Sequence, residues 1–265
     1  MQFAILSSQR RGFYRAAIFS CLTLALTLSS VQVRAVAPAA LYGEKGAVAS
    51  RAVPASQAGA DILAAGGTAV DAAVAVGFAL AVTYPSAGNL GGGGFMVIHL
   101  ADGRVVTNDH RERAPLKATR DMFLDANGDL VKGLSTASHL AVGVPGSVQG
   151  LLDVLEKYGT LPRAKVLQPA IDLAEKGFIL DRDLAGQFAR RQTDFAPYPA
   201  STAIFSKDGE PYQAGDLFVQ KDLAETLKRI QKQGRDGFYA GKTADWLVAE
   251  MEQNGGLSSH QDLQG

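Results

Sequence analysis

The chain has 265 residues, of which 47% are hydrophobic and 20% are charged, and 26 Lys and Arg residues balance 26 Asp and Glu residues. This composition is typical of a globular protein and excludes a disordered chain or a fibre. The charge is unevenly distributed, because residues 1–35 carry four arginines and no acid. The remaining residues are mildly acidic and have no basic stripe, which argues against nucleic-acid binding.

Residues 1–35 are predicted to be a secretory signal peptide. Three arginines near the N-terminus precede the uncharged segment 16–28, and the small residues Val33 and Ala35 follow this segment. The rival interpretation is a retained membrane anchor, but the apolar segment is shorter than the ~20 residues that span a bilayer. We therefore expect cleavage after Ala35 and a mature protein, residues 36–265, that is periplasmic or secreted and not bound to the membrane.

The only cysteine is Cys21, which lies in the predicted signal peptide. A mature chain without a thiol has no disulfide, no cysteine-ligated zinc, no iron–sulfur cluster and no cysteine nucleophile. Lipidation of Cys21 is an alternative that the apolar sequence around it does not favour.

Two helices are predicted first, over residues 54–65 and 69–83. Glycine after residue 65 suits the end of the first helix, and Thr68 with Asp71 forms a capping-box pattern at the start of the second. The second helix is apolar nearly all round, so we expect it to be buried on most sides and central to the fold.

A hairpin is predicted next, with strands 95–100 and 104–109 around Asp102-Gly103, a pair that suits a primed two-residue turn. The first strand is apolar on both faces, which predicts a sheet covered on both sides.

The rest of the chain is predicted to be mostly helical. Helices are expected over residues 148–157, 163–176, 181–192, 221–233 and 242–254, with a Pro- and Ser-rich loop over 197–211. Residues 256–265 resemble the first turn of an unfinished helix, and one turn should not be stable alone. Two strands also leave sheet edges unpaired, so we expect the chain to be truncated.

The glycine run Gly91–Gly94 precedes a strand. It is therefore neither a phosphate-binding P-loop nor a dinucleotide fingerprint, since both precede a helix. Two interpretations stay open: a loop of backbone donors near a ligand, or a tight entry into the strand.

Arg111 is the main candidate for a binding residue, because it follows the second hairpin strand directly. A guanidinium there is able to bind a carboxylate through two parallel hydrogen bonds. The alternative is a surface arginine paired with Glu112 or Asp109.

No catalytic or metal site is apparent in the remaining candidates. The histidines (His99, His110, His139 and His260) lack the spacing of a helical zinc site, and no cofactor motif is present. The serines considered as nucleophiles (Ser56, Ser86, Ser135, Ser138 and Ser147) lack a nucleophile-elbow motif.

Six ordered motifs resemble the large subunit of the gamma-glutamyltranspeptidases. They lie at residues 55–59, 66–75, 88–95, 109–115, 143–147 and 237–241. The resemblance implies an N-terminal nucleophile hydrolase, an α+β protein that holds part of a layered αββα fold. It also implies a precursor that cleaves itself into a large and a small subunit.

In such a family the N-terminal threonine of the small subunit attacks the γ-glutamyl amide of glutathione, and its α-amine serves as base. Water or an amino acid or peptide then accepts the γ-glutamyl group. Arg111 matches the family arginine that binds the α-carboxylate, and His110 stands where an aromatic residue is common. The resemblance places the nucleophile and the oxyanion donors outside this chain, which is expected to be inactive alone and to need no cofactor or metal.

Two other functions remain open. One is an acylase of the same superfamily that hydrolyses a glutaryl side chain. The other is a non-catalytic, truncated subunit that binds small acidic ligands or another chain.

Overall fold

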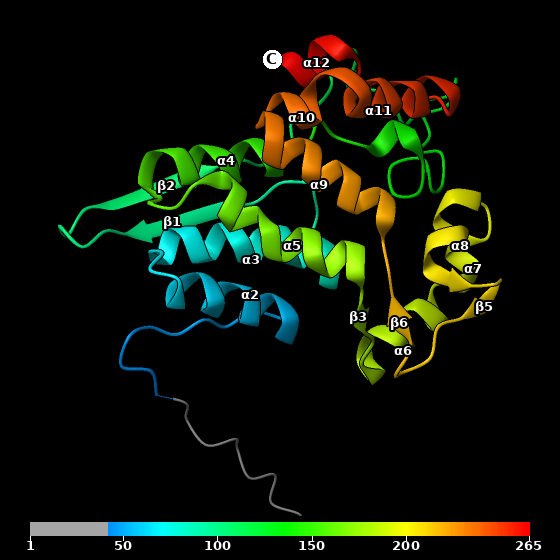
Figure 1. Ribbon diagram of the computed structural model, residues 1–265. Helices are drawn as coiled ribbons and strands as arrows, with labels where there is room; N and C mark the ends of the chain where they lie inside the picture. Colours follow the sequence, from blue (N-terminus) through cyan, green and yellow to red (C-terminus); the bar gives the residue numbers. More distant parts are fainter. Residues whose placement is uncertain (1–41) are drawn as a thin grey trace, which may run out of the picture. The chain divides into compact units, whose positions relative to one another are not determined.

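The computed structural model describes residues 42–265. The chain separates into two units, residues 1–43 and 44–265, and every element below belongs to the second unit (Figure 1). The predicted signal peptide lies outside the described residues. Between residues 42 and 265, no helix has the length and apolar character needed to cross a membrane.

The second unit is mostly helical, with small antiparallel sheets that pair β1 with β2, β3 with β6 and β4 with β5. The elements in chain order are α2 (Val53–Ala64), α3 (Ala69–Thr83), β1 (Phe95–His99), β2 (Val105–Asp109), η1 (His139–Ala141), α4 (Ser147–Tyr158), α5 (Arg163–Lys176), β3 (Phe178–Ile179), α6 (Arg182–Arg190), α7 (Gln192–Phe195), α8 (Pro199–Phe205), β4 (Ser206–Lys207), β5 (Glu210–Pro211), β6 (Leu217–Phe218), α9 (Lys221–Gln233), α10 (Asp236–Tyr239), α11 (Gly241–Gln253) and α12 (His260–Gln264). A mostly helical protein with a β-hairpin is thus confirmed.

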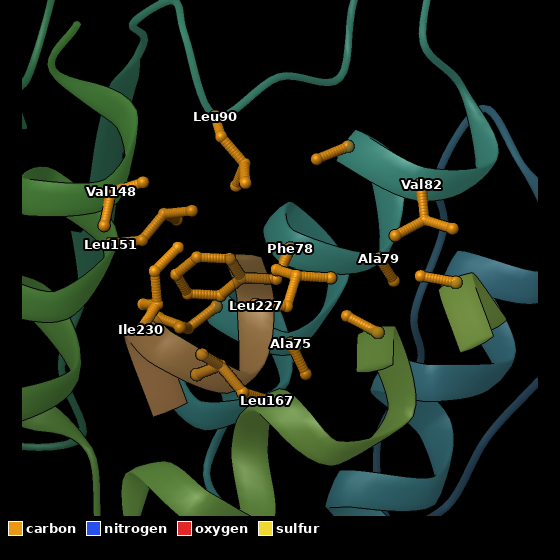
Figure 2. Close-up of a cluster of buried hydrophobic side chains, with 14 of the residues drawn as sticks. Ala75, Phe78, Ala79, Val82, Leu90, Val148, Leu151, Leu167, Leu227 and Ile230 are labelled. Carbon is orange, nitrogen blue, oxygen red and sulfur yellow. The ribbon is translucent and has the colours of Figure 1, made fainter. Parts of the chain in front are cut away.

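Helix α3 is the centre of the hydrophobic core. It packs against α2, α4 and α5, and α5 packs in turn against α9 (Figure 1). Figure 2 shows Phe78 of α3 surrounded by side chains that include Leu151 of α4 and Leu227 and Ile230 of α9. The apolar sequence of α3 predicted this position correctly, because a helix without a polar face needs cover on most sides.

Asp71 is a fully buried carboxylate that joins the start of α3 to the loop between α4 and α5. It forms the predicted capping box with Thr68. It also accepts hydrogen bonds from the backbone N–H groups of Thr160 (2.9 Å) and Leu161 (3.0 Å). Burial by itself raises the pKa of Asp71, but the hydrogen bonds from Leu161, Thr68 and Thr160 outweigh it and lower the pKa to about 2.

β1 and β2 form the predicted hairpin, in a register that pairs Phe95 with Asp109. The face that packs towards the helices carries Met96, Ile98 and Val106. The prediction that both faces are covered is wrong for the residues described, since Phe95 and Val97 of the outer face are 67% and 74% exposed. The reason is that the helical layer lies on one side of the hairpin only.

Two of the three Asp-Gly pairs of the chain lie in hairpin turns, and these two turns differ. At the first pair the loop has three residues, because Leu100 N–H donates to the carbonyl of Arg104 (2.8 Å) and Gly103 is left-handed (φ 87°). The prediction of a primed two-residue turn at this pair is therefore wrong. It occurs instead between β4 and β5, where Asp208 and Gly209 both have positive φ (55° and 87°).

Segment 197–211, predicted to be a loop, contains α8 and the β4–β5 pair. Pro199 lies in the first turn of α8, where its fixed φ and missing N–H are tolerated. At the other end Phe205 packs on Phe188 and stacks on Phe195, with ring centroids 5.2 and 5.1 Å apart. Tertiary burial of these aromatic rings orders the segment, which its Pro- and Ser-rich composition did not indicate.

Contacts from elsewhere in the fold hold α12, the single turn that was not expected to be stable alone. Ser259 and Asp262 form a capping box at its start. Leu116 N–H donates to Asp262 (2.7 Å), and the guanidinium of Arg235 donates to the carbonyl of Leu263 (3.0 Å). These long-range hydrogen bonds offset the cost of nucleating one turn.

Asp71→Asn is expected to lower the free energy of unfolding by about 2 kcal/mol at pH 7, because the amide loses the charge that the surrounding donors stabilise. The pKa of Asp71 near 2 in the folded protein lies below its ordinary value of about 3.9. Its stabilisation is therefore present above about pH 4 and is lost as the pH falls towards 2. Urea unfolding at pH 7 and pH 3 measures the difference.

The control is Asp61→Asn, an exposed carboxylate on α2 that accepts a hydrogen bond from Gln57. It should change stability by no more than about 0.5 kcal/mol. An Asp71→Asn effect that is as large at pH 3 as at pH 7 would show that the charge is not the stabilising feature.

Candidate functional site

A cavity of about 510 Å³ lies where the end of β2 meets α4, α10 and α12. Its walls come from residues 108–111 and Arg113, from residues between 144 and 153, and from residues in and beside α10 and α12 (orange and red in Figure 1). The walls thus combine segments that are far apart in the sequence. We call it the Arg111 cavity.

Arg111 follows the end of β2 by two residues and lines this cavity. Its side chain is exposed, and among residues 42–265 its guanidinium has no ion-pair partner. Asp109 accepts a hydrogen bond from the backbone N–H of Arg111 (3.0 Å), not from the side chain. The alternative of an ion pair with Asp109 or Glu112 is therefore not observed, and the guanidinium is available to an anionic ligand.

Arg113 and Arg235 also line the cavity. Backbone hydrogen bonds with Val144 (3.2 and 2.8 Å) fix the position of Arg113. Arg235 has a structural role. Its guanidinium lies over the ring of Tyr239, 4.9 Å from the centroid, and donates hydrogen bonds to carbonyl groups of α12. Arg111 and Arg113 therefore supply the positive charge of this cavity that has no ion-pair partner among residues 42–265.

Acidic side chains complete the lining, namely those of Asp109, Asp153 and Asp262. A cavity with both signs of charge suits a ligand that carries both a carboxylate and an ammonium group. Asp262 already accepts hydrogen bonds from Leu116 and Ser259, which lower its pKa against the effect of burial. This leaves Asp109 and Asp153 as the more available acids.

Tyr239 joins α10 to the start of α4. Its hydroxyl donates to the carbonyl of Pro145 (3.0 Å) and accepts from the backbone N–H of Gln149 (3.2 Å). Burial raises the pKa of Tyr239, so the phenol stays protonated at neutral pH and serves as a structural hydrogen-bond donor.

Gln149 is the one cavity residue with an orphaned atom, because its buried Oε1 has no hydrogen-bond partner among the described residues. Its Nε2 donates to Asp153 (2.5 Å) one turn further along α4. Neither Gln149 nor Asp153 nor Arg235 stands out as a site residue in the sequence. Only the folded chain brings α4 and α10 to Arg111, although Tyr239 lies in a motif noted in the sequence.

The peptide between His110 and Arg111 lies against Gly146 and Gly93, and a side chain at either glycine would clash with it. A Cβ atom on Gly146 would lie 2.1 Å from the carbonyl oxygen of His110, and one on Gly93 would lie 2.8 Å from the Cα of Arg111. Gly91, in contrast, faces open space. The glycine run is thus partly a packing device beside the site, because the backbone of Arg111 approaches Gly93 closely.

The other histidines lie outside this cavity. His139 pairs with Glu250 (2.9 Å), His260 lies 3.5 Å from Asp245, and His99 is exposed at the end of β1. In the described part of the chain, no cluster of His, Cys, Asp or Glu is arranged to hold a metal ion.

The serines do not form a nucleophile–base pair among residues 42–265. Ser147 donates to Asn89 (2.5 Å) and Ser56 accepts from the backbone of Ser50 (2.9 Å), so both support local structure. Ser86 lines a separate cavity of about 350 Å³ beside Phe188 and Phe205. That cavity contains none of the charged residues that surround Arg111.

Comparison with known proteins assigns the family. The sequence model described as gamma-glutamyltranspeptidase matches residues 55–265. The glutathione hydrolase proenzyme of Pseudomonas sp. (strain A14) is 49% identical over 243 residues, which cover 91% of this chain and 42% of that protein. The chain therefore belongs to the gamma-glutamyltranspeptidase family, as its motifs indicated.

A solved structure agrees with this assignment. The Helicobacter pylori gamma-glutamyltranspeptidase superposes with a TM-score of 0.84 at 47% identity, over 86% of this chain and 65% of that chain. A curated acylase, the Acylase ACY 1 proenzyme of Pseudomonas sp. (strain V22), is 41% identical over 83% of this chain and 41% of its own length. The chain spans about two fifths of the curated relatives that it matches.

Gly93→Ala is expected to destabilise the protein by about 1–3 kcal/mol, because the new methyl group meets backbone atoms that cannot rotate away. Gly91→Ala, two positions earlier in the same run, should change stability by less than about 0.5 kcal/mol. Thermal unfolding of the two variants measures the contrast. Equal losses would mean that the run does not pack against the Arg111 segment.

Proposed function

We propose that this chain is the N-terminal part of the large subunit of an enzyme that cleaves the γ-glutamyl amide of glutathione and related γ-glutamyl compounds. Family membership supports the reaction class. The observation that carries the substrate class is the guanidinium of Arg111, which lines a cavity of mixed charge without an ion-pair partner among the described residues. No cofactor or metal enters the proposal.

In this proposal Arg111 binds the α-carboxylate of the γ-glutamyl group through two parallel hydrogen bonds. The carboxylate lies at a fixed distance from the γ-carbonyl, so binding at one end of the glutamyl group positions the scissile amide at the other. The acidic side chains of the same cavity suit the neighbouring α-ammonium group. Arg111 thus selects γ-linked substrates and takes no part in bond cleavage.

The nucleophile in this proposal is the N-terminal threonine of a small subunit derived from the same precursor. Its hydroxyl oxygen attacks the γ-carbonyl carbon, the carbon–nitrogen bond breaks, and the departing amine takes up the proton that the hydroxyl releases. Water or the amine of an amino acid or peptide then attacks the γ-glutamyl ester and regenerates the threonine. This chain alone would bind but not cleave.

The exposed hairpin supports the proposal that the fold here is part of a layered αββα structure. Phe95, Val97 and Val105 on the outer face of β1 and β2 are all more than half exposed, and large apolar side chains on a sheet normally face a second layer. The relatives are more than twice as long as the matched region. We propose that the remainder of the precursor covers this face.

An acylase is the second candidate function, because an acylase proenzyme is among the relatives. A glutaryl group has the carboxylate but not the α-amine, so Arg111 would serve both substrates. Rates of the full-length protein on γ-glutamyl and glutaryl anilides separate the two functions. Preference for the glutaryl substrate would replace our proposal, and failure of the complete, processed protein to cleave either would favour a non-catalytic binding subunit.

In the full-length protein, Arg111→Ala is expected to lower kcat/KM for a γ-glutamyl anilide about 10- to 100-fold, mainly through KM. Arg111→Lys should restore little of it, because an ammonium group does not form the paired hydrogen bonds. On γ-aminobutyryl anilide, which has no carboxylate, Arg111→Ala should change little. Steady-state kinetics on both substrates measure the effect.

The matched control is Arg104→Ala at the far end of the hairpin, where the arginine pairs with Asp102 in solvent. It should leave both rates unchanged. Equal losses on the two anilides in Arg111→Ala would rule out a carboxylate-binding role for Arg111.

We also propose that residues 1–35 direct export and are removed, which leaves a periplasmic or secreted enzyme. N-terminal sequencing of the large subunit from a Gram-negative host should find Val36 as the first residue. Ala35→Tyr should block this cleavage, since the processing site requires a small residue there. Mature protein that retains the arginines of residues 10–15 would contradict the proposal.

A further inference from the structure

His110 is more tightly enclosed than Arg111, which follows it. The backbone N–H of His110 donates to the carbonyl of Gly94 (3.0 Å), and its carbonyl accepts from Gly94 N–H (3.3 Å). This pairing extends the hairpin by one step beyond the last strand pair, Phe95 with Asp109. Of the hydrogen-bonded pairs of this hairpin, it is the one nearest to Arg111.

The imidazole ring of His110 lies between two positions that have no side chain. A Cβ atom on Gly150 of α4 would lie 2.2 Å from both the Cβ and the Cγ of His110, and one on Gly94 would lie 2.9 Å from its Nε2. The ring nitrogen Nδ1 lies 2.6 Å from Oδ1 of Asn108. The helix, the strand entry and β2 therefore confine the ring together.

Burial lowers the pKa of His110, an effect that Asp109 and Glu112 partly oppose. A neutral ring fits this environment, because one nitrogen donates to the Asn108 oxygen while the other needs no proton. The ring is thus packed between Gly150, Gly94 and Asn108. It is not an exposed acid or base.

The side chain of Arg111, unlike its backbone, has few restraints. Its backbone N–H is bound within its own segment by Asp109, and its exposed side chain has no ion pair among the described residues. The direction in which the guanidinium leaves the backbone therefore depends on the peptide that His110 provides. Further along, Arg113 is fixed again by its pairing with Val144.

Resting on the proposed function, we propose that His110 is a positioning residue: its wedged ring fixes the backbone from which Arg111 projects and so sets the affinity of the cavity for the substrate's α-carboxylate. His110 does not touch the substrate in this proposal. Its effect is transmitted through Arg111 alone, which makes it separable from a general contribution to stability.

A double-mutant cycle in the full-length, processed protein tests this. His110→Ala in the wild-type background is expected to raise KM for a γ-glutamyl anilide about tenfold, because a small displacement of the guanidinium weakens paired hydrogen bonds. In the Arg111→Ala background the same substitution should change KM less than twofold, since coupled residues are not additive. On γ-aminobutyryl anilide His110→Ala should have no effect in either background.

Two further variants keep the test decisive if His110→Ala is not processed into subunits. Asn108→Ala removes the partner of Nδ1 but keeps the imidazole ring, and should raise KM about threefold in the wild type and not in Arg111→Ala. His99→Ala is the matched control, a histidine at the other end of the same hairpin that is exposed to solvent, and should leave KM unchanged.

The outcomes are distinct. Dependence of the His110 and Asn108 effects on Arg111 supports the proposal. Equal KM changes in both backgrounds, or no change in either, overturn it and leave the proposed function intact. If Arg111→Ala alone has no effect on the γ-glutamyl substrate, the proposed function itself fails.

Discussion

The structure around the candidate site depends on one steric constraint, the close passage of the peptide between His110 and Arg111 along positions that have no side chain. Gly93 comes from the loop before β1, and Gly146 comes from the turn before α4. An ordinary residue at either position would put a Cβ inside the van der Waals radius of this peptide. The hairpin and α4 approach each other as closely as they do because both contribute glycine here.

The same loop also links the site to the core. The carbonyl of Gly92 accepts hydrogen bonds from the N–H groups of Gly146 (2.7 Å) and Ser147 (3.0 Å), so it caps the start of α4. Asn89 accepts from the Ser147 hydroxyl and from Gly92 N–H (2.9 Å). The loop follows α3, the helix at the centre of the hydrophobic core, and thus fixes the peptide before Arg111 relative to the core.

Local signals predicted much of the fold. Helix 69–83 begins at the capping residue Thr68, and helices 163–176 and 221–233 end at Gly177 and Gly234, as the sequence indicated. These signals are reliable because a helix end is determined by groups within one turn of it. Helix α8 was missed, since its order comes from aromatic rings that only the folded chain gathers around Phe205.

The candidate site, like the fold, was predictable from the sequence only in part. Arg111 was identifiable from its place after a strand and from the motif around it. Its missing ion pair and the identity of its neighbours on α4 and α10 were not, because residues more than thirty positions away form the other walls. The wedge of His110 against Gly150 likewise joins two segments that no sequence pattern relates.

The central claim is that the guanidinium of Arg111 receives the carboxylate of a γ-glutamyl ligand. A crystal structure of the full-length, processed protein with bound glutamate measures this most directly. We expect two nitrogen–oxygen distances of about 2.7–3.2 Å between Arg111 and the α-carboxylate. A bound glutamate whose α-carboxylate lies elsewhere, with Arg111 paired to a protein carboxylate, would contradict the claim.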